Sequence, residues 1–308
     1  MSSSGNSSQQ VALPADISKN FLQTVGIAAL LILVWVRWND FIGVFTNVLL
    51  LIYSVVVKIG FLDAIGAFGI TIILFTLLIR LVTYPMMAKQ IKSGTQMQAA
   101  MQSKEWQAIQ KKYKDDKEKL AAEQMKFYQE KGISPFSSCL PSLLQFPVMI
   151  ALYQSVIRAV ATSPLDLLNF TRGIYGFIDA SNLIPLHSNF LWMNLGQPEG
   201  LPLPFNISFL PNGFPTLAVL VAITTFIQFK VTQTSMPTSS DPNDQATQMN
   251  RTMGVYMPLM LGYFALSYAS GLGLYLLASN LLTVGQYAIM GKVNWRNLFS
   301  SPPPPAKK

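Results

Sequence analysis

Long runs of apolar residues, separated by short polar segments, set the pattern of this chain. A helix needs roughly 20 consecutive apolar residues to cross the hydrocarbon core of a bilayer, and several runs approach that length. We expect five core spans, at residues 64–85, 135–158, 213–230, 254–268 and 271–291. The connection between the last two is so short that they should form a tight antiparallel pair. The pattern therefore predicts an all-α polytopic membrane protein.

The segment before these spans is less regular. Residues 1–20 are rich in Ser, Gln and Asn and predict a flexible tail. Residues 21–36 are apolar, and suit either a signal-peptide core or a slightly short spanning helix. The residues that follow, RWND, are not the small residues of a cleavage site. This favours a retained N-terminal anchor over a cleaved signal.

Residues 41–60 are apolar but interrupted by polar side chains. Thr46, Asn47, Ser54 and Lys58 would be costly on a helix surrounded by lipid. We therefore expect an amphipathic helix lying in the membrane interface. A second interpretation, in which this helix crosses the bilayer, stays open.

Residues 86–131 have a different character, being rich in Gln, Lys, Glu, Ala and Met, which all favour helices. The sequence KYKDDK at 112–117 is its most polar point and predicts a turn, after which Asp115 and Asp116 can cap a second helix. Gly132 then provides a helix end. We expect a two-helix coiled-coil hairpin, with helices of about 27 and 15 residues, projecting from the membrane.

This hairpin has two interpretations. A charged segment is often no more than a solvated face. Alternatively it is a docking arm, because methionines adapt to varied partners and lysines attract lipid headgroups or ribosomal RNA. The candidate docking residues are Met97, Met101, Lys111, Lys112, Lys114 and Lys117.

The composition agrees with a membrane protein. The chain is 51% hydrophobic and only 12% charged, about half the ~25% charged share of a soluble domain. Its mean hydropathy is +0.36. One Cys and one His exclude an internal disulfide and a His-rich metal site, so no metal or other cofactor is expected. These numbers exclude an ordinary soluble enzyme.

The basic residues predict the orientation. The connecting segments are the hairpin, an external loop at 161–212, a cytoplasmic loop at 231–253 and a basic tail at 292–308. Lys and Arg number ten in the hairpin, two within residues 230–252 at the cytoplasmic loop and four in the tail, against four on the opposite side. The positive-inside rule therefore places the hairpin and the C-terminus in the cytoplasm.

Arg80 is unusual because it lies within an apolar span that contains no acidic partner. An arginine at membrane depth costs several kcal/mol unless it finds water or a partner. Its long side chain could reach the nearby headgroups. However, Thr76 lies four residues earlier on the same helical face and extends a polar stripe toward the bilayer centre. A hydrated cavity would explain both residues.

Uncharged polar residues occur in the other spans. They are Gln145, Thr224, Thr225, Gln228, Ser279, Asn280 and Gln286. Each alone is commonly a hydrogen-bonding contact between helices, but together they could line a wet groove around Arg80. No carboxylate lies within the spans, which argues against proton-coupled transport. The zinc-protease, Walker A and dinucleotide motifs are also missing from the sequence, so we do not expect an enzyme.

Several motifs in order resemble the YidC insertase family, whose relatives include the mitochondrial Oxa and chloroplast Albino proteins. They are IRLVTYPM at 79–86, KYKDDKEKLAAEQMKFYQEKGISP at 112–135, CLPSLLQFPVMIALYQSV at 139–156, FLWMNLGQPEGLPLP at 190–204, TTFIQFK at 224–230 and FALSYASGLGLYLLASNLLTVGQY at 264–287. The resemblance implies an insertase of the bacterial cytoplasmic membrane, which moves client transmembrane segments into the bilayer.

The resemblance also assigns roles. Arg80 matches an arginine of that family that lies in a hydrophilic groove, which is open to the cytoplasm and to lipid but closed outside. Thr76 matches a functionally sensitive threonine one turn before that arginine. Gln228 matches a glutamine that lines the groove. Tyr275 matches a tyrosine of the last span, but Leu276 stands where many relatives have an aromatic residue. The groove candidates are Arg80, Thr76, Gln228, Tyr275, Asn280 and Gln145. Implied partners are nascent membrane-protein clients, the Sec translocon, the ribosome and the phospholipid bilayer, with no small-molecule substrate.

Two other classes of function stay open from the residues. A small-solute transporter or channel would favour internal repeats, which the two halves of the sequence do not show. A ribosome tether without insertase activity would need only the hairpin and the tail.

Overall fold

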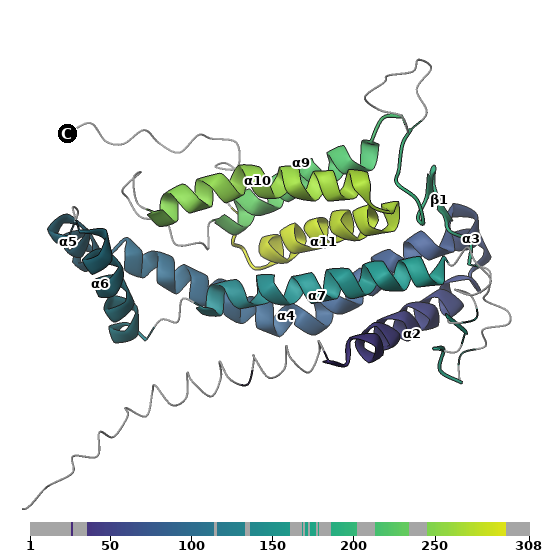
Figure 1. The fold of residues 1–308 in the computed structure, drawn as a ribbon, viewed down its shortest axis with the longest axis horizontal. Helices are drawn as coiled ribbons and strands as arrows, with labels where there is room; N and C mark the ends of the chain where they lie inside the picture. The colour runs from purple at the N-terminus through teal and green to yellow at the C-terminus, as the bar shows by residue number, and fades with distance from the viewer. Residues whose placement is uncertain are drawn as a thin grey trace, which may run out of the picture.

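The computed structural model describes residues 36–113, 116–132, 136–160, 186–201, 213–233 and 245–293, together with residues 26, 168, 170–171, 173–176 and 178. Nearly all of the predicted tail 1–20, the anchor 21–36 and the basic tail 292–308 lies outside these residues. Within the described part, almost all regular structure is helical (Figure 1). The all-α prediction is therefore confirmed.

Nine helices and one short ribbon make up the described structure. They are α2 (Trp38–Val56), α3 (Gly60–Ile65), α4 (Ala67–Met101), α5 (Lys104–Lys112), α6 (Lys117–Glu130), α7 (Phe136–Ala159), β1 (Asn189–Phe190), β2 (Met193–Asn194), α9 (Thr216–Gln233), α10 (Gln245–Ser267) and α11 (Ser270–Ile289). Strands β1 and β2 pair antiparallel.

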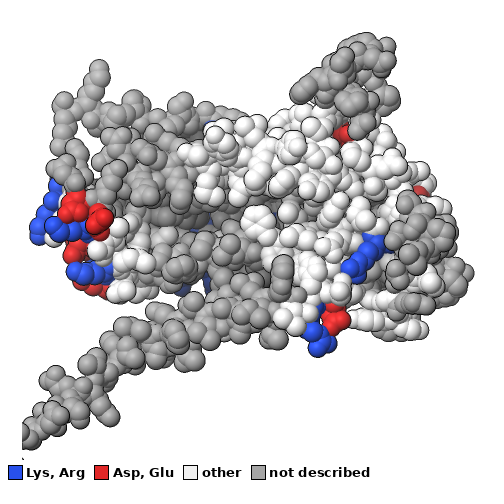
Figure 2. All heavy atoms as spheres, in the orientation of Figure 1, with Lys and Arg blue, Asp and Glu red and all other residues white. Residues whose placement is uncertain are grey.

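The long helices form a bundle in which α4 is central. Helices α7, α2 and α11 all pack on α4, and α9 packs on both α10 and α11. The hairpin helices α5 and α6 lie at one end of the bundle, while α3 and β1 lie at the other (Figure 1). Charged side chains gather at the hairpin end, whereas the described surface over the rest of the bundle is mostly uncharged (Figure 2).

Four of the helices are long and apolar enough to cross a membrane. They are α2, α4, α9 and α11, whereas α7 and α10 contribute the shorter apolar stretches Phe146–Ala159 and Thr252–Ser267. Two of the five expected spans are thus short within the described residues, and α2 meets the criterion although it was expected in the interface. The five-span count stays a prediction.

Two of the polar residues of α2 are explained by packing. Thr46 and Asn47 are both buried. The Thr46 hydroxyl donates to Ser155 Oγ of α7 at 3.0 Å. Asn47 Nδ2 donates to Gly173 O at 3.0 Å, and Asn47 Oδ1 accepts from Tyr175 N at 2.7 Å. These side chains face α7 and the loop residues Gly173 and Tyr175, so they no longer argue for a helix lying in the interface.

The hairpin differs in detail from the expected pair of helices. Its first helix is continuous with the first core span through Pro85 and ends at Met101. A new helix then starts because the Ser103 hydroxyl accepts from Trp106 N at 3.3 Å, as an N-cap does. Asp116 caps α6 by accepting from Lys119 N at 3.1 Å. Hydrogen bonds from the backbone and the side chain of Lys119 lower the pKa of Asp116.

A tight contact closes the end of the bundle opposite the hairpin. Gly66, which precedes α4, has φ +120°, a conformation that favours glycine. A Cβ added at Gly69 would stand only 2.2 Å from the ring of Phe190, which is itself buried. The absence of a side chain at Gly69 therefore lets the ribbon pack directly on α4.

We predict that Gly69→Ala destabilises the protein by about 1–3 kcal/mol, because the added methyl overpacks against Phe190. Thermal unfolding of the purified protein in detergent measures this change. Gly43→Ala is the matched control, since a Cβ there meets nothing within 4 Å and alanine favours helix. The double variant Gly69→Ala, Phe190→Ala should lose less stability than the sum of the two single losses, because the methyl and the ring no longer clash. Equal melting temperatures for Gly69→Ala and Gly43→Ala would contradict the packing.

Candidate functional site

A cavity of about 330 Å³ lies among α4, α7, α9, α10 and α11. This volume is far larger than the roughly 15 Å³ that a single water molecule needs. The cavity wall includes Arg80, Gln228 and Asn280, three of the residues that the sequence singles out. The fold therefore brings residues from three separate spans to one hollow.

Arg80 turns its head group into the bundle. Its Nη2 donates to the hydroxyl of Ser279 on α11, and also to Ser279 O at 3.3 Å. Gln286 Nε2 donates to the backbone oxygen of Arg80 at 3.3 Å. Among the described residues, no carboxylate lies within ion-pair distance of this guanidinium. Arg80 thus keeps an uncompensated positive charge at the edge of the cavity.

Asn280 joins the last span to α9. With its amide oriented to satisfy both ends, Asn280 Nδ2 donates to Gln228 Oε1 and to Leu276 O, the latter at 3.3 Å. Its Oδ1 accepts from Thr225 Oγ1 at 2.8 Å. Asn280 and Thr225 are largely buried, and both line the cavity together with Gln228. This network holds α9 against α11 and gives the wall of the cavity a polar surface.

Two other groove candidates lie elsewhere. Thr76 is completely buried, and its hydroxyl donates to Ile72 O of its own helix at 2.6 Å. Tyr275 is also buried, in the main apolar cluster of the bundle. Neither residue lines the cavity. Gln145 lies in α7, but its side chain is outside the described residues.

The docking candidates of the hairpin differ in their burial. Met97 and Met101 are buried in a small apolar cluster with Trp106, Phe127 and Tyr128. The side chains of Lys111 and Lys112 are exposed. Lys114 and the side chain of Lys117 lie outside the described residues. The two methionines therefore hold the hairpin together, and the exposed surface near them is lysine-rich.

The cavity extends from Arg80 toward the hairpin, in the direction opposite to Thr76. On α4 its wall continues through Thr83, Met87, Gln90 and Gly94. These positions are three or four residues apart and so share one helical face with Arg80. This spacing is present in the sequence, but the polar stripe formed by Arg80 and Thr76 predicted a cavity that extends toward the bilayer centre instead.

Methionines make up much of the remaining wall. Met86 and Met87 of α4 line the cavity, and so do Met253 and Met257 of α10. Met257 follows Met253 by four residues, a helical spacing that a search for polar groups overlooks. Methionine side chains are flexible and polarizable, so they can fit apolar groups of different shapes. The cavity combines a cation, uncharged polar groups and adaptable apolar groups, which suits an amphiphilic polypeptide.

The described residues contain no group of three or more His, Cys, Asp or Glu side chains placed to hold a metal ion. The chemistry that the cavity does offer is solvation. Polar groups that would be costly in lipid can here meet water, hydroxyls, amides and a positive charge.

Residues 60–296 match the protein family described as "60Kd inner membrane protein". A similar protein is "Membrane protein insertase YidC" of Oceanobacillus iheyensis, which is 32% identical over 229 residues, covering 73% of this chain and 75% of that protein. Another is "Membrane protein insertase YidC 1" of Halalkalibacterium halodurans, 34% identical over 231 residues, covering 73% of this chain and 71% of that protein.

Some relatives are much longer. "ALBINO3-like protein 1, chloroplastic" of Arabidopsis thaliana is 31% identical over 229 residues, which are 73% of this chain but 43% of that protein. For the YidC protein of Syntrophobacter fumaroxidans the matched part is 33% of its length. The chain thus spans a third to a half of the length of several relatives that it matches.

We predict that Asn280→Leu lowers the stability of the protein by about 1–3 kcal/mol, because buried polar groups on α9 lose their partner. Thermal unfolding in lipid nanodiscs measures the change. Thr283→Val on the same helix is the control, since within the described part of the chain the Thr283 hydroxyl donates to Ser279 O of its own helix, at 2.7 Å. Equal losses for the two variants would show that the contact between α9 and α11 does not depend on Asn280.

Proposed function

The chain belongs to the 60Kd inner membrane protein family, which includes the YidC insertases and the ALBINO3 proteins, and from this we propose that it is a membrane protein insertase. Its clients are transmembrane segments that enter the cavity beside Arg80 and leave sideways into the lipid bilayer. The single observation that carries this proposal is the Arg80 cation on the wall of a cavity of about 330 Å³, with no carboxylate partner among the described residues.

The physical task of an insertase is to move the polar flank of a client across an apolar layer. Burying polar groups in lipid is costly, and charged groups cost more. A wet cavity that reaches part of the way through the bundle shortens the apolar path. The positive charge of Arg80 attracts acidic residues in the client tail, and low-dielectric walls strengthen that attraction.

The apolar part of the client supplies the energy for its release. Its residues gain about 25 cal/mol for each Å² of apolar surface removed from water, so a helix of ~20 apolar residues prefers lipid strongly. The methionines of the cavity can contact such a segment transiently without selecting one shape. We propose that insertion proceeds in this way either alone or with the Sec translocon.

The location and the partners follow from the charge distribution. We propose that the protein lies in the bacterial cytoplasmic membrane with the hairpin and the C-terminus in the cytoplasm. What supports this is the gathering of lysines at the hairpin end (Figure 2). The exposed Lys111 and Lys112 would there approach the ribosome or anionic lipid headgroups, since both carry phosphate.

We predict that Arg80→Ala reduces the insertion of single-span clients with acidic tails about ten-fold, because the attracting charge is lost. Arg80→Lys, which keeps the charge, should be impaired much less. Complementation in cells depleted of their own insertase, with membrane insertion of the client as readout, measures both. A client whose tail lacks acidic residues is the control and should respond less to either variant.

Unimpaired insertion by both Arg80 variants would overturn the role of the charge. It would favour the simpler view in which the arginine side chain only reaches for headgroups.

A further inference from the structure

A short segment crosses the end of the bundle opposite the hairpin. We define residues 189–201 as the clasp. Leu191 N of the clasp donates to Ile65 O at 3.2 Å, just before α4. Its carbonyl oxygens accept from the start of α11, where Ser270 N donates to Gln197 O at 2.7 Å and Gly271 N to Leu195 O at 3.0 Å. The clasp thus connects helices that are far apart in sequence.

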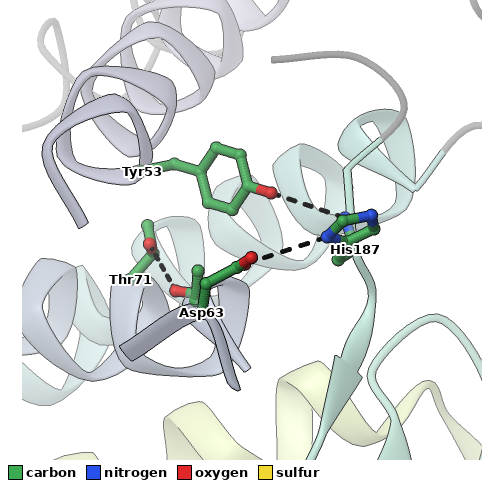
Figure 3. A network of polar contacts seen from close by, with 5 residues as sticks. Tyr53, Asp63, Thr71 and His187 are labelled. Carbon is green, nitrogen blue, oxygen red and sulfur yellow. Dashed lines mark hydrogen bonds and ion pairs between the residues drawn. The ribbon is translucent and has the colours of Figure 1, made fainter. Parts of the chain in front are cut away.

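The residues that lead into the clasp are anchored as well. Figure 3 shows Tyr53 of α2, Asp63 of α3 and His187 pointing toward one another. His187 Nδ1 lies 3.8 Å from Asp63 Oδ1, and His187 N donates to the Tyr53 hydroxyl at 3.5 Å. The contact between His187 and Asp63 joins exposed side chains, and the hydrogen bond to Tyr53 is long. Both contacts therefore hold the segment only weakly.

Glu199 is the buried polar residue of the clasp. It is 5% exposed, which is rare for a glutamate without a cationic partner, and the described residues give it none. Its Oε1 accepts from Trp192 Nε1 at 2.9 Å, and its Oε2 accepts from Leu217 N at 3.0 Å. Leu217 lies in the first turn of α9, where backbone N–H groups lack partners within the helix. Glu199 therefore caps α9 from another part of the chain.

The helices beneath the clasp are tightly packed against one another. On α4, Phe68, Ile72 and Phe75 are at most 1% exposed, and the cavity wall on that helix begins only at Ile79. The polar cavity therefore ends between the clasp and Arg80. An opening at the clasp would give water a second route toward that cavity.

We propose that Glu199 is a positioning residue that fastens the clasp to α9 and so keeps the end of the bundle under the clasp closed. The relevance of this closure to insertion rests on the proposed function, but the closure itself does not. Both oxygens of Glu199 accept a hydrogen bond. Glutamine has the same shape but only one accepting oxygen, so its amide group must face one of the two N–H donors.

A cysteine buried under the clasp can report its opening. Val156 of α7 is completely buried, and its Cγ1 lies 2.9 Å from where a Cβ on Gly271 would stand. The full chain carrying Cys139→Ser and Val156→Cys is reconstituted into lipid vesicles and treated with a membrane-impermeant maleimide. The labelling rate then tracks the population of the open clasp.

We expect Glu199→Gln to raise the labelling rate of the Val156→Cys reporter roughly ten-fold or more, because a buried hydrogen bond is replaced by two opposed donors. Trp192→Phe removes one of these donors and should raise the rate less. The double variant should label no faster than Trp192→Phe alone, because the amide of glutamine then faces no donor. A rate for Glu199→Gln equal to that of the parent, or effects of the two substitutions that simply multiply, would overturn the proposal.

A second reporter distinguishes clasp opening from general unfolding. Ile91 of α4 is 1% exposed and lies at the hairpin end of the bundle. Ile91→Cys should label at the same rate with and without Glu199→Gln, and a parallel rise at both reporters would overturn the proposal. Because labelling needs no client, a failure of the Arg80 insertion experiment would refute the proposed function without affecting this result.

Discussion

An unpaired guanidinium inside a bundle of apolar helices has to be solvated, and much of this structure follows from that requirement. Arg80 finds Ser279 as a hydrogen-bond partner but no carboxylate among the described residues. A charge in this position needs water or strong dipoles near it. The cavity supplies room for both, and the amides of Gln228 and Asn280 extend its polar surface to neighbouring helices.

This requirement divides α4 into two parts. From Phe68 to Thr76 the inward face of the helix is buried, and the Thr76 hydroxyl donates to a carbonyl oxygen of its own helix. After Arg80 the same face lines the cavity as far as Gly94. The buried part is packed tightly enough that Gly69 must lack a side chain beside Phe190. On the proposed function, tight packing at one end of the bundle and a polar cavity at the other would let a polar client segment enter part of the way without opening a path through the membrane.

The sequence predicted features that depend on local patterns. Apolar run lengths indicated the all-α membrane fold, and the lone charge in a span identified Arg80. Polar residues were harder to place, because a pattern does not say which neighbour a side chain meets. Thr46 and Asn47 suggested an interfacial helix but are buried against α7 and a loop. Glu199 was missed because its partner Leu217 lies 18 residues away. Such contacts arise only from tertiary packing.

On the proposed function, a client segment occupies the cavity next to Arg80. A photoreactive amino acid at Met87 on the cavity wall, tested against a ribosome-stalled nascent membrane protein, examines it most directly. Val82 is the matched control, since it lies on the same helix, is 69% exposed and does not line the cavity. We expect strong crosslinks to the nascent chain from Met87 and weak ones from Val82. No crosslink from Met87, as a simple ribosome tether would give, or equal crosslinks from both positions would contradict it.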